Sequence, residues 1–205
     1  MIKTYLSFLV VVLNTFIVLF AQQSRGFPYK NPTLPVETRV ADLLSRMTLE
    51  EKVGQLLCPL GWEMYKIKGN DVLPSDKFKQ LIKDRNAGML WATYRADPWT
   101  KKTLATGLNP ALAAKAGNAL QKYVMENTRL GIPLFLAEEA PHGHMAIGTT
   151  VFPTGIGMAA TWSPQLINEV GKAIGKEIRL QGGHISYGPV LDLARDPRWS
   201  RVEET

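Results

Sequence analysis

Two clusters of charged and aromatic residues each follow an apolar segment of the chain. The first spans residues 138–144 and reads EEAPHGH, and the second spans residues 192–204 and reads DLARDPRWSRVEE. Charged groups gathered at the carboxyl end of a buried strand are where α/β proteins place their binding and catalytic chemistry. We therefore expect both clusters to contribute to one site.

The first cluster begins with Glu138 and Glu139, directly after the apolar segment 132–137. A carboxylate there can accept hydrogen bonds from two neighbouring hydroxyls of a sugar ring, and a charged acceptor forms the stronger bonds. The alternative is that the two glutamates cap the next element and the histidines are ordinary loop residues. The residue types alone leave both interpretations open.

A metal site is a further alternative for the first cluster. Glu139, His142 and His144 are suitable ligand types, and three ligands with one water would serve a catalytic zinc ion. However, Pro141 prevents a regular helix across the cluster, and the chain contains neither an HExxH motif nor a pair of cysteines. We therefore predict that the chain uses no metal and no other cofactor.

The second cluster is dense in alternating charge, and most of its residues should form salt bridges that fix a loop. Trp199 is expected to pack within it, and at least one arginine should point into a cleft, because the guanidinium group can donate to adjacent hydroxyls. No phosphate-binding loop, GxGxxG or GxSxG motif is present. The charged residues of this cluster are Asp192, Arg195, Asp196, Arg198, Arg201, Glu203 and Glu204.

Three apolar segments are predicted strands that would position these clusters: residues 87–91, 132–137 and 185–193. A helix with Leu112, Ala116, Leu120 and Val124 on one face separates the first two. A second helix, starting at Ser163-Pro164 and ending at Gly182-Gly183, precedes the third strand. Residues 61–84 are predicted to form a loop and a short helix, and we find no signal for a tight hairpin.

Strands that alternate with helices predict a parallel sheet with right-handed crossovers. The expected fold class is therefore α/β. An incomplete (β/α)8 TIM-like barrel, of which the chain holds only the first strands and helices, fits best. A doubly wound open sheet is the alternative.

The amino-terminal segment differs in kind from the rest. Lys3 precedes an apolar stretch that ends at Ala21, the pattern of a signal peptide over residues 1–21, with a retained membrane anchor as the alternative. We expect export to the periplasm or the extracellular space, without stable membrane association after cleavage. Residues 22–35 are predicted to be an extended lead-in, and residues 36–205 one domain.

Near the start of that domain, a helix is expected from Val36 to Met47. Thr48 and Glu51 form a capping box for a second helix, whose inward residues should be Val53, Leu56 and Leu57. The composition is that of an ordinary globular protein, 45% hydrophobic with a net charge of +6. The chain contains no run of Lys and Arg comparable to a nucleic-acid-binding arm, so we expect no nucleic-acid partner.

Several motifs occur in an order that resembles glycoside hydrolase family 3. Residues 47–56 (MTLEEKVGQL) resemble the opening helix of that family. Residues 139–143 (EAPHG) with 150–153 (TVFP) resemble its first sugar-binding loop. Residues 188–192 (GPVLD) with 196–204 (DPRWSRVEE) resemble its second.

The resemblance covers residues 33–205 and implies an exo-acting retaining β-glycosidase. A β-glucosidase is favoured, with a β-xylosidase or a non-catalytic carbohydrate-binding protein as alternatives, and the partner is an oligosaccharide or β-glycoside. Glu139 matches the acidic residue that holds the terminal sugar, where many members carry Asp. Arg201 best matches the sugar-binding arginine, with Arg198 as the alternative, and His142 and Trp199 would shape the pocket.

The same resemblance implies that the catalytic machinery is not within these residues. Family members carry a Lys-His pair, a nucleophilic Asp and an acid/base carboxylate at later positions, so we expect these beyond Thr205. Ser200 stands where glycine is usual, a small departure. The chain is thus expected to be the truncated N-terminal portion of a barrel domain, inactive on its own.

Overall fold

The computed structural model describes residues 26–204, so the predicted signal peptide lies outside the described residues. The chain divides into two compact units, Met1–Thr48 and Leu49–Thr205. Within the first unit, the lead-in contains a short 3-10 helix, η1 (Pro28–Lys30), and is followed by the helix α2 (Val36–Arg46). The backbone N–H of Tyr29 donates to the carboxylate of Asp42 at 3.1 Å, which joins η1 to α2.

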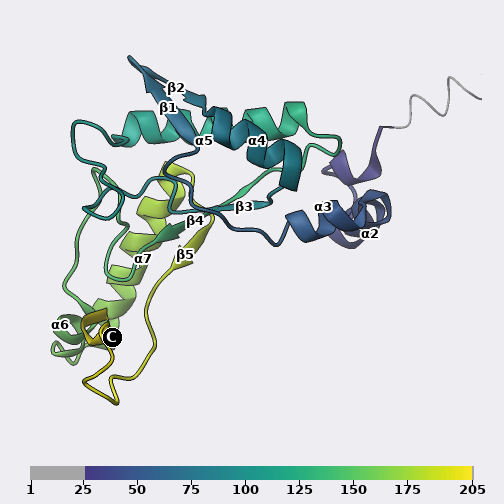
Figure 1. The fold of residues 1–205 in the computed structure, drawn as a ribbon. Helices are drawn as coiled ribbons and strands as arrows, with labels where there is room; N and C mark the ends of the chain where they lie inside the picture. The colour runs from purple at the N-terminus through teal and green to yellow at the C-terminus, as the bar shows by residue number, and fades with distance from the viewer. Residues whose placement is uncertain (1–25, 205) are drawn as a thin grey trace, which may run out of the picture. The chain divides into compact units, whose positions relative to one another are not determined.

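The second unit is built on a three-stranded parallel sheet with the order β3 (Met89–Trp91), β4 (Phe135–Glu139) and β5 (Ile185–Tyr187) (Figure 1). Their pairing confirms the predicted α/β class with parallel strands. Residues 59–61 extend the sheet beyond β3. The N–H of Gly61 donates to the carbonyl of Trp91 at 2.7 Å, and the N–H of Trp91 donates to the carbonyl of Pro59 at 2.9 Å.

Two long helices connect the strands, as predicted: α5 (Pro110–Asn127) joins β3 to β4, and α7 (Pro164–Gln181) joins β4 to β5. Each starts with a side-chain cap followed by proline. Ser163 accepts a hydrogen bond from the N–H of Leu166 at 3.3 Å, and α7 ends at Gly182, which has a φ of 98°. The two helices contact each other (Figure 1).

The hydrophobic core lies where α5 and the helix α4 (Asp76–Arg85) pack against β3 and β4. The buried face of α5 follows helical spacing, as predicted for Ala116, Leu120 and Val124. The small residue Gly117 lets Tyr94 pack against the helix. The other main members of this core are Met64, Tyr65, Val72, Phe78, Ile82, Leu90, Leu108, Ala113, Leu134 and Leu136.

The structure corrects the expectation of no tight hairpin. β1 (Tyr65–Lys68) and β2 (Asp71–Pro74) pair antiparallel through the two-residue turn Gly69-Asn70. Gly69 has a φ of 60°, a conformation that glycine adopts readily. Gly-Asn between two strands is a hairpin signal, but each strand here has only four residues, so the alternation of apolar and polar residues is too short to stand out in the sequence. Ser75 then caps α4, the predicted short helix.

The last strand is shorter than predicted, because β5 ends at Tyr187 and not at Leu193. Gly188-Pro189 follows, and proline has no N–H to donate to a strand ladder. Leu191 and Leu193, which the strand would have buried, are exposed. Residues 188–201 instead form an irregular loop that leads to the 3-10 helix η2 (Val202–Glu204).

The second helix of the capping box is also shorter than its pattern indicates. α3 (Leu49–Gly54) has six residues, and Val53, Leu56 and Leu57 are exposed, so their predicted inward orientation is wrong. The chain leaves the helix at Gly54, whose backbone packs against Arg85 and Asn86 so closely that a Cβ there would meet the Arg85 carbonyl at 2.3 Å. Packing of the backbone therefore overrides the side-chain periodicity.

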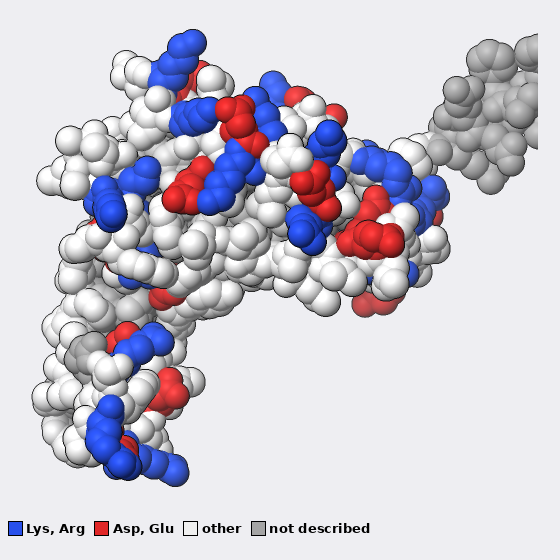
Figure 2. Space-filling view, in the orientation of Figure 1, with Lys and Arg blue, Asp and Glu red and all other residues white. Residues whose placement is uncertain are grey.

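The surface of the described residues carries both signs of charge. Figure 2 shows Lys and Arg interspersed with Asp and Glu on the face in view. Among residues 26–204, no helix is both long and apolar enough to cross a membrane.

Candidate active site

A cleft of about 710 Å³ lies at the carboxyl ends of the three parallel strands. Each strand contributes a residue from its end: Trp91 from β3, Glu139 from β4 and Tyr187 from β5. The loops that follow the strands complete the lining, as in α/β proteins that bind ligands at this edge. The loop residues that line it are Arg95, Trp99, Pro141, His142, Met145, Thr154, Gly188, Pro189, Val190, Leu191, Asp192, Trp199, Arg201 and Glu204.

Glu138 points into the protein and not into this cleft. Its carboxylate is fully buried and accepts hydrogen bonds from the backbone N–H of Thr93 at 3.0 Å and of Tyr94 at 3.3 Å. The imidazole Nε2 of His144 lies 3.4 Å from Oε2, the oxygen that also accepts from the N–H of Tyr94. Burial raises the pKa of Glu138, against the opposing effects of His144 and the two amides. Glu138 therefore fixes the loop after β3.

Glu139 lines the cleft and is half-buried at the end of β4. The indole N–H of Trp91 donates to its Oε1 at 2.7 Å. The backbone carbonyl of Glu139 accepts from the N–H of Met145 at 2.9 Å, which holds the following loop against the strand. Alternation along the strand sends the two adjacent side chains to opposite sides. Of the roles left open by the sequence, Glu138 therefore has the structural one, and Glu139 is available to a ligand.

The two histidines of the first cluster have different surroundings. His142 lines the cleft, and its Nδ1 donates to the carbonyl of Phe152 at 2.9 Å, while the N–H of Phe152 donates back to the carbonyl of His142 at 2.8 Å. His144 is buried beside Glu138. Within the part of the chain that the structure describes, no three His, Cys, Asp or Glu side chains are grouped to hold a metal ion.

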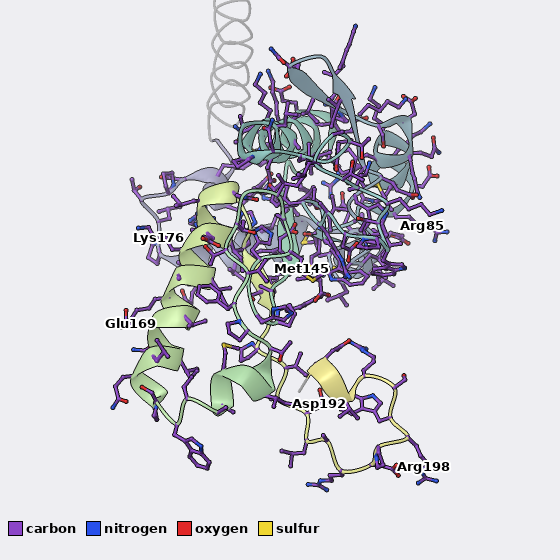
Figure 3. All side chains as sticks on the ribbon, turned by 90° about the vertical axis from the view of Figure 1, so that its left-hand side faces the viewer. Arg85, Met145, Glu169, Lys176, Asp192 and Arg198 are labelled. Carbon is purple, nitrogen blue, oxygen red and sulfur yellow. The ribbon has the colours of Figure 1, made fainter. Side chains whose placement is uncertain are left out.

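The two candidate arginines have different surroundings. Arg201 lines the cleft, and its guanidinium pairs with Glu204 at 2.7 Å (Nε to Oε1) and 2.5 Å (Nη2 to Oε2). Arg198 is almost fully exposed and pairs with Asp196 at 2.9 Å (Nε to Oδ1). Figure 3 shows Arg198 at the outer end of the loop, away from Met145. Trp199 is half-buried and also lines the cleft.

Sequence analysis did not single out the aromatic residues of the cleft wall. Trp91 and Trp99 have ring centres 5.5 Å apart, and Trp62 packs behind both at 6.0 and 5.1 Å. The Arg95 guanidinium lies 4.7 Å from the centre of the Trp99 ring. Trp91 ends a predicted strand and Trp99 follows in the next loop, so the position of the strand end is the signal that could have found them.

This arrangement suits a polyhydroxylated ligand. Glu139 presents a charged acceptor, Arg201 presents charged donors, and both belong to one cleft with aromatic walls. Sugar rings have hydroxyls at their edges, which match the charged groups, and apolar C–H faces that pack on aromatic rings. Glu139 and Arg201 are 62 positions apart in the chain but line the same cavity.

The model of the glycosyl hydrolase family 3 N terminal domain matches residues 48–205. The chain belongs to glycosyl hydrolase family 3. Because the match begins at Thr48, it covers the second compact unit and every strand and cleft residue described above.

Curated relatives support the same family. A Formosa agariphila protein named as a beta-xylosidase is 36% identical over 98% of this chain and 25% of its own length. A periplasmic beta-glucosidase of Salmonella typhimurium is 31% identical over 86% of this chain and 20% of its own length. This family 3 chain therefore spans about a quarter of the length of the curated relatives that it matches.

Solved structures resemble this family 3 chain in fold as well as in sequence. A β-glucosidase from Erythrobacter marinus has a TM-score of 0.64 at 30% identity, covering 87% of this chain and 22% of that one. An exo-1,3/1,4-β-glucanase from Pseudoalteromonas has a TM-score of 0.63 at 28% identity, covering 88% of this chain and 21% of that one.

Proposed function

We propose that this chain supplies the pocket for the terminal non-reducing sugar of an exo-acting, retaining β-glycosidase. The single observation that carries the proposal is that Glu139 and Arg201, from distant parts of the sequence, line one cleft at the strand ends. In this proposal Glu139 accepts hydrogen bonds from sugar hydroxyls and Arg201 donates to them. His142 and Trp199 shape the pocket, and Arg198 takes no part in binding.

The proposed fold is the first part of a (β/α)8 barrel formed by residues 36–205. Support comes from consecutive parallel strands in chain order, β3, β4 and β5, each pair connected by a helix of 18 residues. The edge segment at residues 59–61, parallel to β3, fits an additional barrel strand. Retaining hydrolysis needs two carboxylates about 5–5.5 Å apart. We propose that this pair lies outside the residues present here.

β-Glucosides are the proposed substrates, and β-xylosides are the alternative. Relatives carry both names, beta-xylosidase in Formosa agariphila and beta-glucosidase in Salmonella typhimurium. A Listeria innocua β-glucosidase of 26% identity and TM-score 0.60 was solved in complex with isofagomine, and its mutant of 25% identity with laminaribiose. These names favour glucosides, although Glu139 carries a longer side chain than the Asp expected in many family members.

Export is the proposed location, with residues 1–21 as a signal peptide that is removed. The relatives in Salmonella typhimurium and Dickeya chrysanthemi are named as periplasmic enzymes, which supports this proposal. N-terminal sequencing of the protein recovered from the periplasm or medium tests it. A mature protein that starts near Gln22 is expected, and a mature protein that retains Met1 would contradict the proposal.

The activity is tested by assaying the protein that carries this chain on aryl β-D-glucosides and aryl β-D-xylosides. We expect release of the terminal sugar with retention of the β-anomer, seen by proton NMR in the first minutes of reaction. Activity should be unchanged by a chelator. Inversion at the anomeric carbon, or loss of activity with the chelator, would overturn the proposed mechanism. Tight sugar binding without hydrolysis would favour a carbohydrate-binding protein.

A further inference from the structure

The indole N–H of Trp91 donates a hydrogen bond to the carboxylate of Glu139. Among the residues that the structure describes, the hydrogen bonds place no other donor on this carboxylate, and the contact between Nε1 and Oε1 is 2.7 Å long. A donor at this distance to a charged acceptor makes a strong hydrogen bond. An ionised carboxylate has about four acceptor positions on its two oxygens, so Glu139 keeps acceptor positions for a ligand.

Trp91 is itself held firmly. Its backbone N–H and carbonyl are both paired with the edge segment, to Pro59 and Gly61. Its ring packs against the rings of Trp62 at 6.0 Å and Trp99 at 5.5 Å. Trp62 is buried, which supports this aromatic group from behind. The indole N–H is therefore a fixed donor, and the longer, more flexible Glu side chain is the partner that it orients.

We propose that Trp91 is a positioning residue for sugar binding and acts through Glu139. This inference rests on the proposed function of Glu139. A glutamate side chain has three rotatable bonds, and fixing them before the ligand arrives removes an entropic cost from binding. Trp91 also directs Oε1 toward the indole, so that the remaining acceptor positions receive the sugar hydroxyls. The hydrogen bond from Trp91 thus holds the long side chain of Glu139 in one orientation.

A double-mutant cycle tests this role in the protein that carries this chain. Trp91→Phe removes the indole N–H and retains an aromatic ring. We expect it to lower kcat/KM on an aryl β-glycoside about tenfold, mostly through KM. In the Glu139→Ala background, the same Trp91→Phe change should alter kcat/KM by less than about twofold, because the carboxylate that it orients is gone.

The matched control is Trp162→Phe, since Trp162 is 92% exposed and does not line the cleft. It should leave kcat/KM unchanged. Thermal unfolding of each variant shows whether it has folded, and Trp91→Leu, which also lacks a side-chain donor, serves if Trp91→Phe unfolds early. An equal loss in both backgrounds would overturn the positioning role and indicate a packing role. Normal kinetics for Glu139→Ala would instead overturn the proposed function itself.

Discussion

The carboxylate of Glu138 accepts a hydrogen bond from the backbone N–H of Thr93 at 3.0 Å and so joins the end of β4 to the loop after β3. Glu139, the next residue, faces the cleft. One strand end thus carries a buried carboxylate that fixes the scaffold and an accessible one that is available to a ligand. The two roles follow from the alternation of side chains along a strand.

Glu138 should make stability depend on pH. Because burial raises its pKa above the ordinary 4.5, the folded protein keeps this proton to a higher pH than the unfolded chain does. The resulting stabilisation is complete below pH 4.5 and is lost as the pH rises through the folded-state pKa. Glu138→Gln cannot titrate. We therefore expect the unfolding temperature of the wild type, relative to that of Glu138→Gln, to fall as the pH rises above 4.5 and through the raised pKa of Glu138. A difference independent of pH would contradict this.

Gly188 should tolerate no side chain. A Cβ at this position would lie 2.1 Å from the carbonyl oxygen of Ala140, which belongs to the neighbouring strand end and cannot move aside easily. We expect Gly188→Ala to destabilise the protein by about 1–3 kcal/mol, as overpacking does. The control is Gly171→Ala in α7, where a Cβ meets nothing within 4 Å and helix propensity should add about 0.5–1 kcal/mol. Chemical denaturation measures both, and equal effects would be inconsistent with the close backbone approach.

The two arginines of the second cluster should differ in function. Arg201 lines the cleft, so Arg201→Ala should lower kcat/KM at least tenfold, about 1.4 kcal/mol of transition-state binding. Arg198 pairs with Asp196 in solvent, and such exposed pairs contribute little, so Arg198→Ala should stay within about twofold of the wild type. Steady-state kinetics of the two variants on one aryl β-glycoside measures the contrast. A larger loss of kcat/KM for Arg198→Ala than for Arg201→Ala would identify Arg198 as the sugar-binding arginine.

Local signals were sufficient to predict the helices and strands that frame the site. Ser163-Pro164 and Gly182 carry the information that starts and ends α7. The apolar run 132–137 predicts β4, which the structure places at Phe135–Glu139, with Phe135 exposed and the next three residues buried. The sequence also identified Glu139 and Arg201 as candidates, and the structure places both on one cleft.

Other features depend on contacts that local patterns do not contain. The apolar run 185–193 reads as one strand, yet pairing ends at Tyr187 because the chain turns away at Gly188-Pro189. The separate roles of Glu138 and Glu139 depend on which face of β4 meets the loop after β3. Likewise, the bond between Trp91 and Glu139 joins residues 48 positions apart, and only the parallel pairing of β3 and β4 brings them together.

Replacement of Glu139 by alanine tests the central claim most directly. In the protein that carries this chain, Glu139→Ala should reduce kcat/KM on aryl β-glycosides at least tenfold, while Glu169→Ala on the exposed face of α7 should leave it unchanged. Sugar hydroxyls would lose their charged acceptor in the first variant only. Near wild-type kinetics for Glu139→Ala on every aryl β-glycoside tested would contradict the account.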